Sequence, residues 1–147
     1  MGIQDYSIRK CRKTMEKLTI KIETNKKEEL INITRQVQDL ISENDIENGI
    51  AILFVPHTTA GITITENADP DVTRDIIVGL RRAFPNEGFL HMEGNSDAHI
   101  KSTITNFSQT LIIENGKLVL GTWQGIYFCE YDGPRIRKVY VKILPDG

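Results

Sequence analysis

Alternating and continuous runs of apolar residues predict the elements of the first third of the chain. Apolar and polar residues alternate over 16–23, which predicts a half-buried strand, and a second short strand is predicted over 30–33. Thr34 can N-cap a helix whose apolar residues recur at helical spacing between 37 and 41. The run at 50–55 is apolar throughout, which is typical of a strand buried on both faces.

The middle of the chain adds one strand and two helices. Residues 61–65 alternate again and predict a strand. Asp69 followed by Pro70 predicts a helix start, with the aspartate as N-cap and the proline at the first helical position. This helix is expected to run to about residue 84, and after an irregular loop a shorter helix is predicted across 97–105.

The last third of the chain predicts only strands. Four are expected from residue 109 onward, and the last three cover 117–121, 123–130 and 136–144. An Asn-Gly pair inside 114–117 predicts a tight hairpin turn before the first of these strands. The predicted order is therefore two strands and a helix, two strands and two helices, and then four strands.

These elements predict one α+β domain. A chain of 147 residues suits a single domain, and we expect residues 15–147 to form it. The expected architecture is a mostly antiparallel mixed sheet with helices on one face. Residues 1–14 lie outside the pattern and are expected to be an N-terminal extension, whose basic run at 9–13 is typical of a solvated tail.

Composition narrows the classes of partner. Lys and Arg number 18 against 20 Asp and Glu, for a net charge of −2, which argues against nucleic-acid binding through a broad basic face. No apolar run approaches the ~20 residues of a membrane span, and 1–14 contains no apolar leader segment. Cys11 and Cys129 form no CxxC motif. We expect a cytoplasmic protein with two free thiols and neither nucleic-acid nor membrane partners.

All three histidines lie in two short segments. His57 belongs to 55–61, and His91 and His99 belong to 91–101. Imidazole exchanges protons near neutral pH and is also a common metal ligand. Because His57 comes directly after the predicted strand at 50–55, where functional side chains often gather, we expect the three imidazoles to open onto one cleft.

The segment 91–101 allows three interpretations. The helix start near Ser96 offers unpaired backbone N–H groups, and Lys101 adds a cation, so a phosphate or carboxylate could bind there. Alternatively, the three histidines could hold a divalent metal, with Glu93 or Asp97 as a further ligand or supporting partner. The third interpretation is a capped loop–helix junction with a surface pair between Asp97 and Lys101.

Two other segments carry polar or aromatic groups without an obvious structural duty. The hydroxyls of Thr58 and Thr59 could bind phosphate oxygens or orient an imidazole, although threonines often simply end a strand. Asn67 follows an alternating strand and has no evident structural role. Trp123, inside 121–125, could stack on a planar ligand, fill a subunit interface or be an ordinary core residue.

Four motifs follow one another along the chain: VPHTTA at 55–60, ENADPD at 66–71, EGNSDAHIK at 93–101 and GTWQGI at 121–126. Together they resemble the YjbQ-like family, an uncharacterised family in which some members are described as secondary thiamine-phosphate synthases. The resemblance covers roughly 16–145. Gly61 stands where many relatives carry a second alanine.

The resemblance implies a compact α+β fold, a homotrimer, and a cleft near the subunit boundary lined by the His57 and His99 motifs. It also implies a reaction that joins an aminopyrimidine pyrophosphate to a thiazole phosphate. Such a reaction needs groups that hold pyrophosphate, usually with Mg²⁺. The chain shows no Asp-rich diphosphate motif and no nucleotide-binding glycine fingerprint.

We therefore expect a site that acts on a small phosphorylated metabolite. The alternatives are a metal-dependent hydrolase or lyase of such a metabolite, and a non-catalytic trimeric protein that binds an anion. Truncation of His99 or Lys101 is expected to change stability little, because both lie in a polar segment. The candidate catalytic residues are His57, Glu93, Asp97 and His99. The candidate ligand-binding residues are Thr58, Thr59, Asn67, Asn95, Ser96, Lys101, Trp123 and Gln124. The candidate ligands for a divalent metal, Mg or Zn, are His57, His91 and His99.

Overall fold

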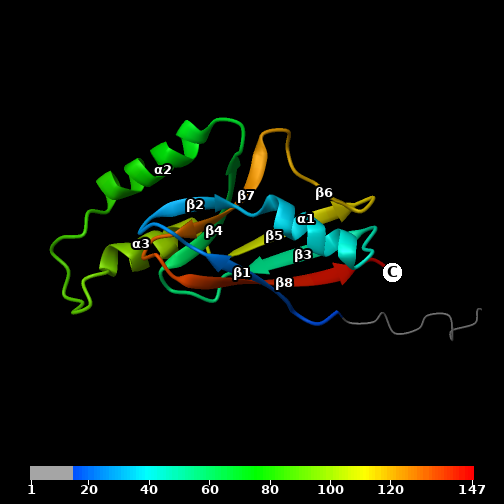
Figure 1. Cartoon of the computed structure of the whole chain (residues 1–147), viewed down its shortest axis with the longest axis horizontal. Helices are drawn as coiled ribbons and strands as arrows, with labels where there is room; N and C mark the ends of the chain where they lie inside the picture. Colours follow the sequence, from blue (N-terminus) through cyan, green and yellow to red (C-terminus); the bar gives the residue numbers. More distant parts are fainter. Residues whose placement is uncertain (1–14) are drawn as a thin grey trace, which may run out of the picture.

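Strands and helices follow one another in the order that the sequence predicts (Figure 1). The computed structural model of the chain describes residues 15–147, so the expectations for the extension at 1–14 and for Cys11 lie outside the described residues. The elements are β1 Leu18–Glu23, β2 Glu29–Asn32, α1 Thr34–Glu43, β3 Gly49–Phe54, β4 Ala60–Glu66, α2 Pro70–Ala83, α3 Ser96–Thr105, β5 Ser108–Glu114, β6 Lys117–Leu118, β7 Gln124–Glu130 and β8 Ile136–Pro145.

The strands form two antiparallel sheets. Five strands pair in the order β1-β8-β3-β5-β6, and the other three pair in the order β2-β7-β4. Helices α2 and α3 contact the three-stranded sheet, and α1 contacts β6 and β7 (Figure 1). The α+β class and the single domain are confirmed, but the strands divide between two sheets where one mixed sheet was expected.

One apolar cluster fills the space between the two sheets and α1. It takes alternate residues of each strand, because successive side chains point to opposite faces. The expectation that the strand at 50–55 is buried on both faces was wrong, since Ile50 is 39% and Phe54 41% exposed. An antiparallel sheet can leave one face to solvent, and β3 buries only its inward face. Among residues 15–147, no helix is both long and apolar enough to cross a membrane.

Helix α2 starts as predicted, whereas α1 does not. Asp69 is the N-cap of α2, and its Oδ1 accepts a hydrogen bond of 2.9 Å from the Asp71 N–H. At α1 the N-cap is Ile33, and Thr34 is the first helical residue. The Thr34 hydroxyl instead accepts a hydrogen bond of 2.8 Å from the Ile126 N–H of β7. The hydroxyl therefore joins α1 to the three-stranded sheet and is not free to cap the helix.

Two turns set the geometry of the C-terminal strands. The hairpin between β5 and β6 has Asn115 and Gly116 at φ of 52° and 78°, which confirms the Asn-Gly turn. Between β7 and β8 the chain turns through Gly133 and Pro134, which are joined by a cis peptide bond. A Cβ atom on Gly133 would collide with the Lys26 carbonyl oxygen, so the turn requires glycine there.

Helix α3 is anchored by a buried charged network. The Lys101 ammonium lies 3.0 Å from a carboxylate oxygen of Asp97 and 3.0 Å from one of Glu28, and Lys101 is only 1% exposed. Glu28 also pairs with Arg81 of α2 at 2.6 Å. The expectation of a surface pair between Asp97 and Lys101 was therefore wrong, because the opposite helix face carries the solvent-exposed residues of α3.

Truncation of Lys101 was expected to change stability little, but the buried network predicts a large loss of stability. Lys101→Ala leaves Asp97 buried without its cation and takes one of its two cations from Glu28, so we expect the free energy of unfolding to fall by about 3–5 kcal/mol. Lys21→Ala is the matched control, because Lys21 pairs with Glu23 at 3.3 Å in solvent and should cost less than about 1 kcal/mol. Urea denaturation of both variants measures the difference. Equal, small losses would show that the Lys101 network contributes no stability.

Candidate functional site

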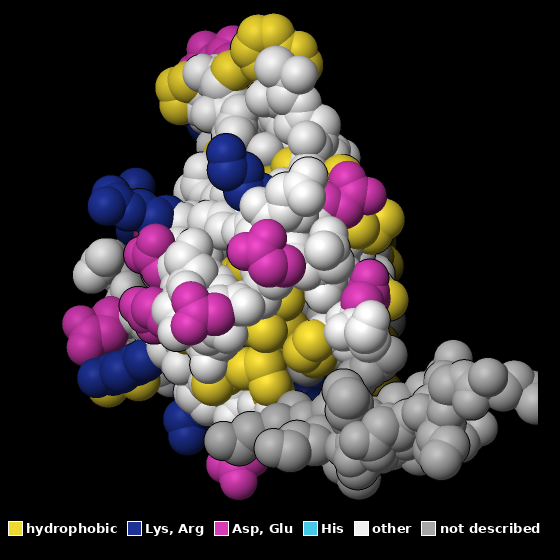
Figure 2. Space-filling view, turned by 90° about the vertical axis from the view of Figure 1, so that its right-hand side faces the viewer, with side chains coloured by type: hydrophobic (Ala, Val, Ile, Leu, Met, Phe, Trp, Pro, Cys, Tyr) yellow, Lys and Arg dark blue, Asp and Glu magenta, His cyan; other side chains and the backbone are white. Residues whose placement is uncertain are grey.

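A cleft of about 390 Å³ opens beyond the end of β3, between the chain entering β4, the start of α3 and the turn before β8. All three histidines line it, so the structure brings the two histidine segments together. Figure 2 views another side of the molecule, on which apolar and acidic side chains are visible and no described histidine is. The residues that line the cleft are Pro56, His57, Thr58, Thr59, His91, Glu93, Asn95, His99, Arg135 and Arg137.

His57 is fixed by the end of the central strand. Val55 is buried, and its N–H donates a hydrogen bond of 2.8 Å to the Phe107 carbonyl oxygen, which ends the regular course of β3. The His57 Nε2 then accepts a hydrogen bond of 2.9 Å from the Lys138 N–H of β8. An acceptor nitrogen carries no proton, so this bond assigns the neutral ring with its proton on Nδ1.

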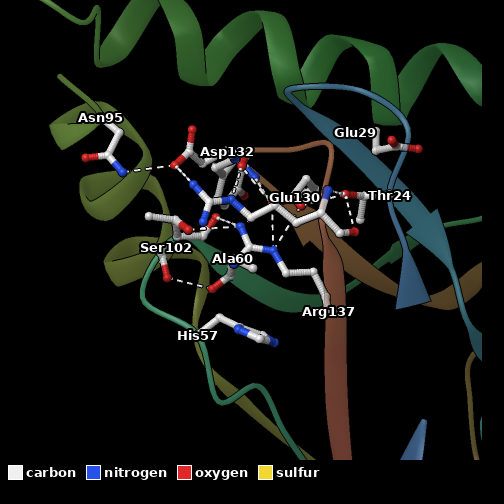
Figure 3. Close-up of polar contacts among 12 residues, drawn as sticks. Thr24, Glu29, His57, Ala60, Asn95, Ser102, Glu130, Asp132 and Arg137 are labelled. Carbon is white, nitrogen blue, oxygen red and sulfur yellow. Dashed lines mark hydrogen bonds and ion pairs between the residues drawn. The ribbon is translucent and has the colours of Figure 1, made fainter. Parts of the chain in front are cut away.

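The electrostatic surroundings also favour the neutral form of His57. Burial lowers the pKa of the imidazole, and the positive charge of Arg137 lowers it further. Figure 3 shows the His57 ring beside the Arg137 side chain. Near neutral pH, His57 therefore offers an Nδ1–H donor and carries no positive charge.

His91 and His99 form a second pair. Their ring centroids lie 5.4 Å apart with an interplanar angle of 77°, an edge-to-face arrangement. His99 belongs to α3, whereas His91 belongs to the exposed loop before that helix. None of the hydrogen bonds among the described residues uses a ring nitrogen of His99. Its imidazole can therefore exchange protons with a bound molecule.

Arg137 lies at the inner wall of the cleft in a buried ion pair with Glu130. The guanidinium Nε lies 2.9 and 3.1 Å from the two carboxylate oxygens, and Nη2 lies 2.5 Å from Oε2 (Figure 3). Nη2 also donates to the Thr59 hydroxyl at 2.9 Å. Arg137 is 4% exposed and Glu130 is 0% exposed. This two-point contact fixes the plane of the guanidinium.

Glu130 is fully satisfied by further donors. Its Oε1 accepts a hydrogen bond of 2.7 Å from the Thr24 hydroxyl, and its Oε2 accepts bonds from the N–H groups of Tyr131 at 3.1 Å and Asp132 at 3.2 Å. A buried carboxylate needs such partners, because desolvation of an unpaired charge is costly. The pair is therefore a rigid part of the cleft wall.

A second arginine is held at the same turn. Arg135 Nη2 lies 2.7 Å from Asp132 Oδ2, and its Nε donates to the Asp132 carbonyl oxygen at 2.7 Å. The same Oδ2 accepts a hydrogen bond of 2.9 Å from the Asn95 side-chain amide. Asn95 is the N-cap of α3, one of the two residues that could cap this helix, but its side chain makes no capping bond and its amide is directed to Asp132. The bond thus connects α3 to the turn before β8.

The fold and sequence identify the family. A profile described as "UPF0047 protein YjbQ-like" matches residues 18–146. The chain belongs to this family. This YjbQ-like protein is 60% identical over 126 residues to UPF0047 protein MJ1081 of Methanocaldococcus jannaschii, an alignment that covers 85% of this chain and 91% of the relative.

Solved structures agree with this membership. The crystal structure of an uncharacterised conserved YjbQ/UPF0047 protein from Clostridium acetobutylicum is 56% identical with a TM-score of 0.84, and covers 86% of this chain and 99% of its own. A protein of unknown function from Sulfolobus solfataricus is 32% identical, also with a TM-score of 0.84, and covers 89% and 97%. These descriptions name no activity.

Several predicted site residues of this YjbQ-like protein lie away from the cleft. Asp97 and Lys101 are buried in the network that anchors α3, and Ser96 begins that helix without lining the cleft. Asp97 and Lys101 pair with each other, and Lys101 also pairs with Glu28, which disfavours the phosphate and metal roles considered for these two residues. Asn67 and Gln124 shape a loop, because the Asn67 amide donates to the Gln124 carbonyl oxygen at 3.0 Å.

Trp123 belongs to the same loop and is 63% exposed, so the interpretation as a core residue was wrong. Gln124 supports its position by accepting a hydrogen bond of 2.8 Å from the Gly121 N–H. Neither residue lines the histidine cleft. An exposed tryptophan on a braced loop fits the interface or stacking interpretations.

Sequence reasoning missed both arginines and their acidic partners. The signal was present in β8, where Val139, Val141 and Ile143 alternate inward and Arg137 continues the same inward positions. Likewise, Glu130 ends an apolar run in β7. A charged residue at an inward strand position requires a buried partner, so these two residues could have been paired from the pattern alone.

The three-histidine metal site is not preformed in this part of the molecule. Within residues 15–147, no group of three or more His, Cys, Asp or Glu side chains is arranged to hold a metal ion. His57 uses Nε2 to accept a hydrogen bond from the Lys138 N–H, so this nitrogen is not free to bind a metal. His91 and His99 are the pair closest to a metal-binding geometry, and metal binding stays a prediction.

The neutral state of His57 predicts a pH dependence of stability. The unfolded chain binds a proton at this residue near its ordinary pKa of 6.5, whereas the lowered pKa disfavours protonation in the folded state. The contribution is therefore fully present above pH 6.5 and is lost as pH falls below it. We expect the unfolding free energy of the parent to fall more steeply between pH 7.5 and about 5 than that of His57→Gln. Parallel urea-denaturation profiles for the two proteins would rule this out.

Proposed function

We propose that the cleft binds the phosphate group of a small phosphorylated metabolite and exchanges a proton with it. The observation that carries the proposal is the state of Arg137. Its Nε and Nη2 are occupied by Glu130 and Thr59, and none of the hydrogen bonds within residues 15–147 uses Nη1. Since Arg137 lines the cleft, this remaining donor end is available to a bound oxyanion.

Further donors surround the same volume. Arg135 adds a second guanidinium, and His57 adds a neutral Nδ1–H. The exposed Thr58 hydroxyl lies beside them. Phosphate oxygens accept several hydrogen bonds at once, so a ring of directed donors suits a phosphate better than a single point charge would.

His99 is the residue that we assign to proton transfer. Its ring nitrogens have no partner among the described residues, whereas His57 is held in one tautomer. A general acid or base must exchange its proton in place, and an imidazole whose ring nitrogens are not bound to the protein can do so. His57 then acts as a fixed donor, and His99 moves the proton.

The thiamine-phosphate synthase reaction implied by the resemblance is a narrower form of this proposal. A pyrophosphate leaving group could use the same arginine donors. A magnesium-assisted departure would also need free carboxylates, but Glu130 and Asp132 already bind the arginines. Among the described residues that line the cleft, Glu93 is the one with a carboxylate. The geometry therefore supports phosphate-ester chemistry more directly than that particular transfer.

A second candidate is a metal-dependent hydrolase or lyase of a phosphorylated metabolite. The observation that favours it is the 5.4 Å separation of the His91 and His99 ring centroids. Two imidazoles that share one zinc ion at Zn–N distances of about 2.0–2.1 Å have ring centroids roughly 5 Å apart. Glu93 lies in the same cleft as a further oxygen ligand for Zn²⁺ or Mg²⁺. Metal analysis of the purified protein separates this candidate from the first.

We also propose that the protein assembles as a homotrimer. The number three comes from the family resemblance. The surface supports an interface, because Trp123 and the outward sheet residues Ile50, Ile112 and Leu144 are exposed. Exposed apolar side chains of this kind are visible on the face in Figure 2. If binding occurs without turnover, the same assembly is a non-catalytic anion-binding protein.

Phosphate recognition is tested by His99→Ala. We expect this variant to lose turnover of, or weaken binding to, phosphate monoesters, while the melting temperature stays within a few degrees of the parent. Thr103→Ala, one turn further along α3 and exposed, is the matched control and should behave like the parent. Calorimetric titration with a panel of phosphorylated metabolites, including thiazole phosphate, measures the binding. Parent-like affinity and turnover in His99→Ala would remove this residue from the mechanism.

The assembly is tested by multi-angle light scattering at micromolar concentration. We expect a particle of three chains, and Trp123→Ala should shift the distribution toward smaller species because a buried aromatic anchor contributes much of an interface's energy. A monomer in the parent protein would exclude the trimer.

A further inference from the structure

We infer that Glu130 is a positioning residue that aims the Arg137 guanidinium into the cleft. The Glu130–Arg137 and Asp132–Arg135 pairs together form a two-arginine clamp. This clamp suits a tetrahedral dianion, so the ligand class is phosphate monoesters. The inference deepens the proposed function and rests on it. Nothing in the sequence motifs of the two histidine segments points to these four residues.

The first arm of the clamp is rigid. Glu130 engages both Nε and Nη2 of Arg137, and its own carboxylate is held by Thr24 and two backbone N–H groups. Thr59, from the chain entering β4, also holds Nη2, so three chain segments fix one guanidinium plane. Because Nε and Nη2 are already bound, Nη1 is the donor end of the guanidinium that is left. Arg137 lines the cleft, so this end can reach a bound molecule.

The second arm is more open. Arg135 lies two residues before Arg137, and its Nε and Nη2 are bound to Asp132. Its side chain is 52% exposed, and no hydrogen bond within the described residues uses its Nη1. Each arginine thus leaves an Nη1 donor unbonded near the start of β8, and two guanidinium donors suit the three unesterified oxygens over which a phosphate monoester spreads its charge.

The charges of the clamp cancel. Arg135 and Arg137 contribute two positive charges, and Glu130 and Asp132 contribute two negative charges at hydrogen-bond distance. Attraction of an anion by net charge is therefore weak, and recognition depends on the direction of the free N–H groups. Removal of the Glu130 carboxylate therefore distinguishes two roles. Phosphate affinity rises if Glu130 only neutralises charge, and it falls if Glu130 positions Arg137.

The experiment is a titration of the full chain with inorganic phosphate, followed by NMR at pH 7.5. Glu130→Gln adds one unit of positive charge to the cleft but leaves Arg137 without its two-point anchor. We expect phosphate affinity to fall about tenfold or more, in spite of the gain in charge. We also expect faster hydrogen exchange of the Arg137 Nε–H in the absence of phosphate.

Glu87→Gln is the matched control. It makes the same substitution and the same change in charge on the exposed loop before α3, outside the cleft lining, and no hydrogen bond or ion pair among the described residues uses the Glu87 side chain. We expect its affinity for phosphate to match that of the parent. If Glu130→Gln fails to fold, Thr24→Val keeps every charge and removes one anchor of the Glu130 carboxylate, and it should weaken phosphate binding several-fold and speed Arg137 Nε–H exchange.

The outcomes separate the two claims. Phosphate binding by Glu130→Gln that is as tight as or tighter than that of the parent and of Glu87→Gln would reduce Glu130 to a neutralising charge and overturn the inference alone. Unchanged affinity and unchanged Nε–H exchange in Thr24→Val would overturn it as well. If the parent protein binds neither phosphate nor a phosphate monoester, the proposed function fails and the clamp loses its ligand class.

Discussion

The buried ion pair between Glu130 and Arg137 is the interaction on which the cleft depends. Glu130 ends β7 in the three-stranded sheet, and Arg137 lies near the start of β8 in the five-stranded sheet, so the pair joins the two sheets at the end where the cleft opens. Removal of one member of such a pair typically costs about 3–5 kcal/mol, because the other charge stays buried. Thr24 and Thr59 extend the contact to the ends of two further strands.

A second buried network sets the position of α3 relative to this pair. Lys101 is enclosed by Asp97 and Glu28, which ties the inner face of the helix to the chain before β2. With that face fixed, the N-terminal turn of α3 carries His99 to the cleft and places Asn95 against Asp132. The charged residues of the EGNSDAHIK motif therefore divide between structure and site, with lysine and aspartate supporting the helix that presents the histidine.

Much of the fold followed from the sequence. Period-two alternation, the Asp69-Pro70 start and the Asn115-Gly116 turn are local signals, and each predicted its element correctly. The separation into two sheets was not predictable in this way, since strand pairing is a long-range property that local patterns do not encode. For the same reason the exposed outer face of β3 was missed, because apolar residues continue on the side that faces away from the core.

The candidate site was predicted in part. Histidine is rare and chemically distinctive in this chain, so its confinement to two segments located the cleft. The arginines were missed because they lie in a strand-turn-strand segment that looked purely structural. Lys101 was placed in the site for the converse reason, since a lysine in a polar motif suggests solvent until its two buried carboxylate partners are known.

The central claim is that the cleft holds a phosphate between the arginine pair and His99. A crystal structure of the protein grown with a phosphate monoester tests it most directly. The account predicts tetrahedral density within hydrogen-bond distance of Arg137 Nη1, with the His99 ring beside it. Density for a metal ion shared by His91 and His99 without phosphate contact to Arg137, or phosphate bound only elsewhere on the surface, would contradict it.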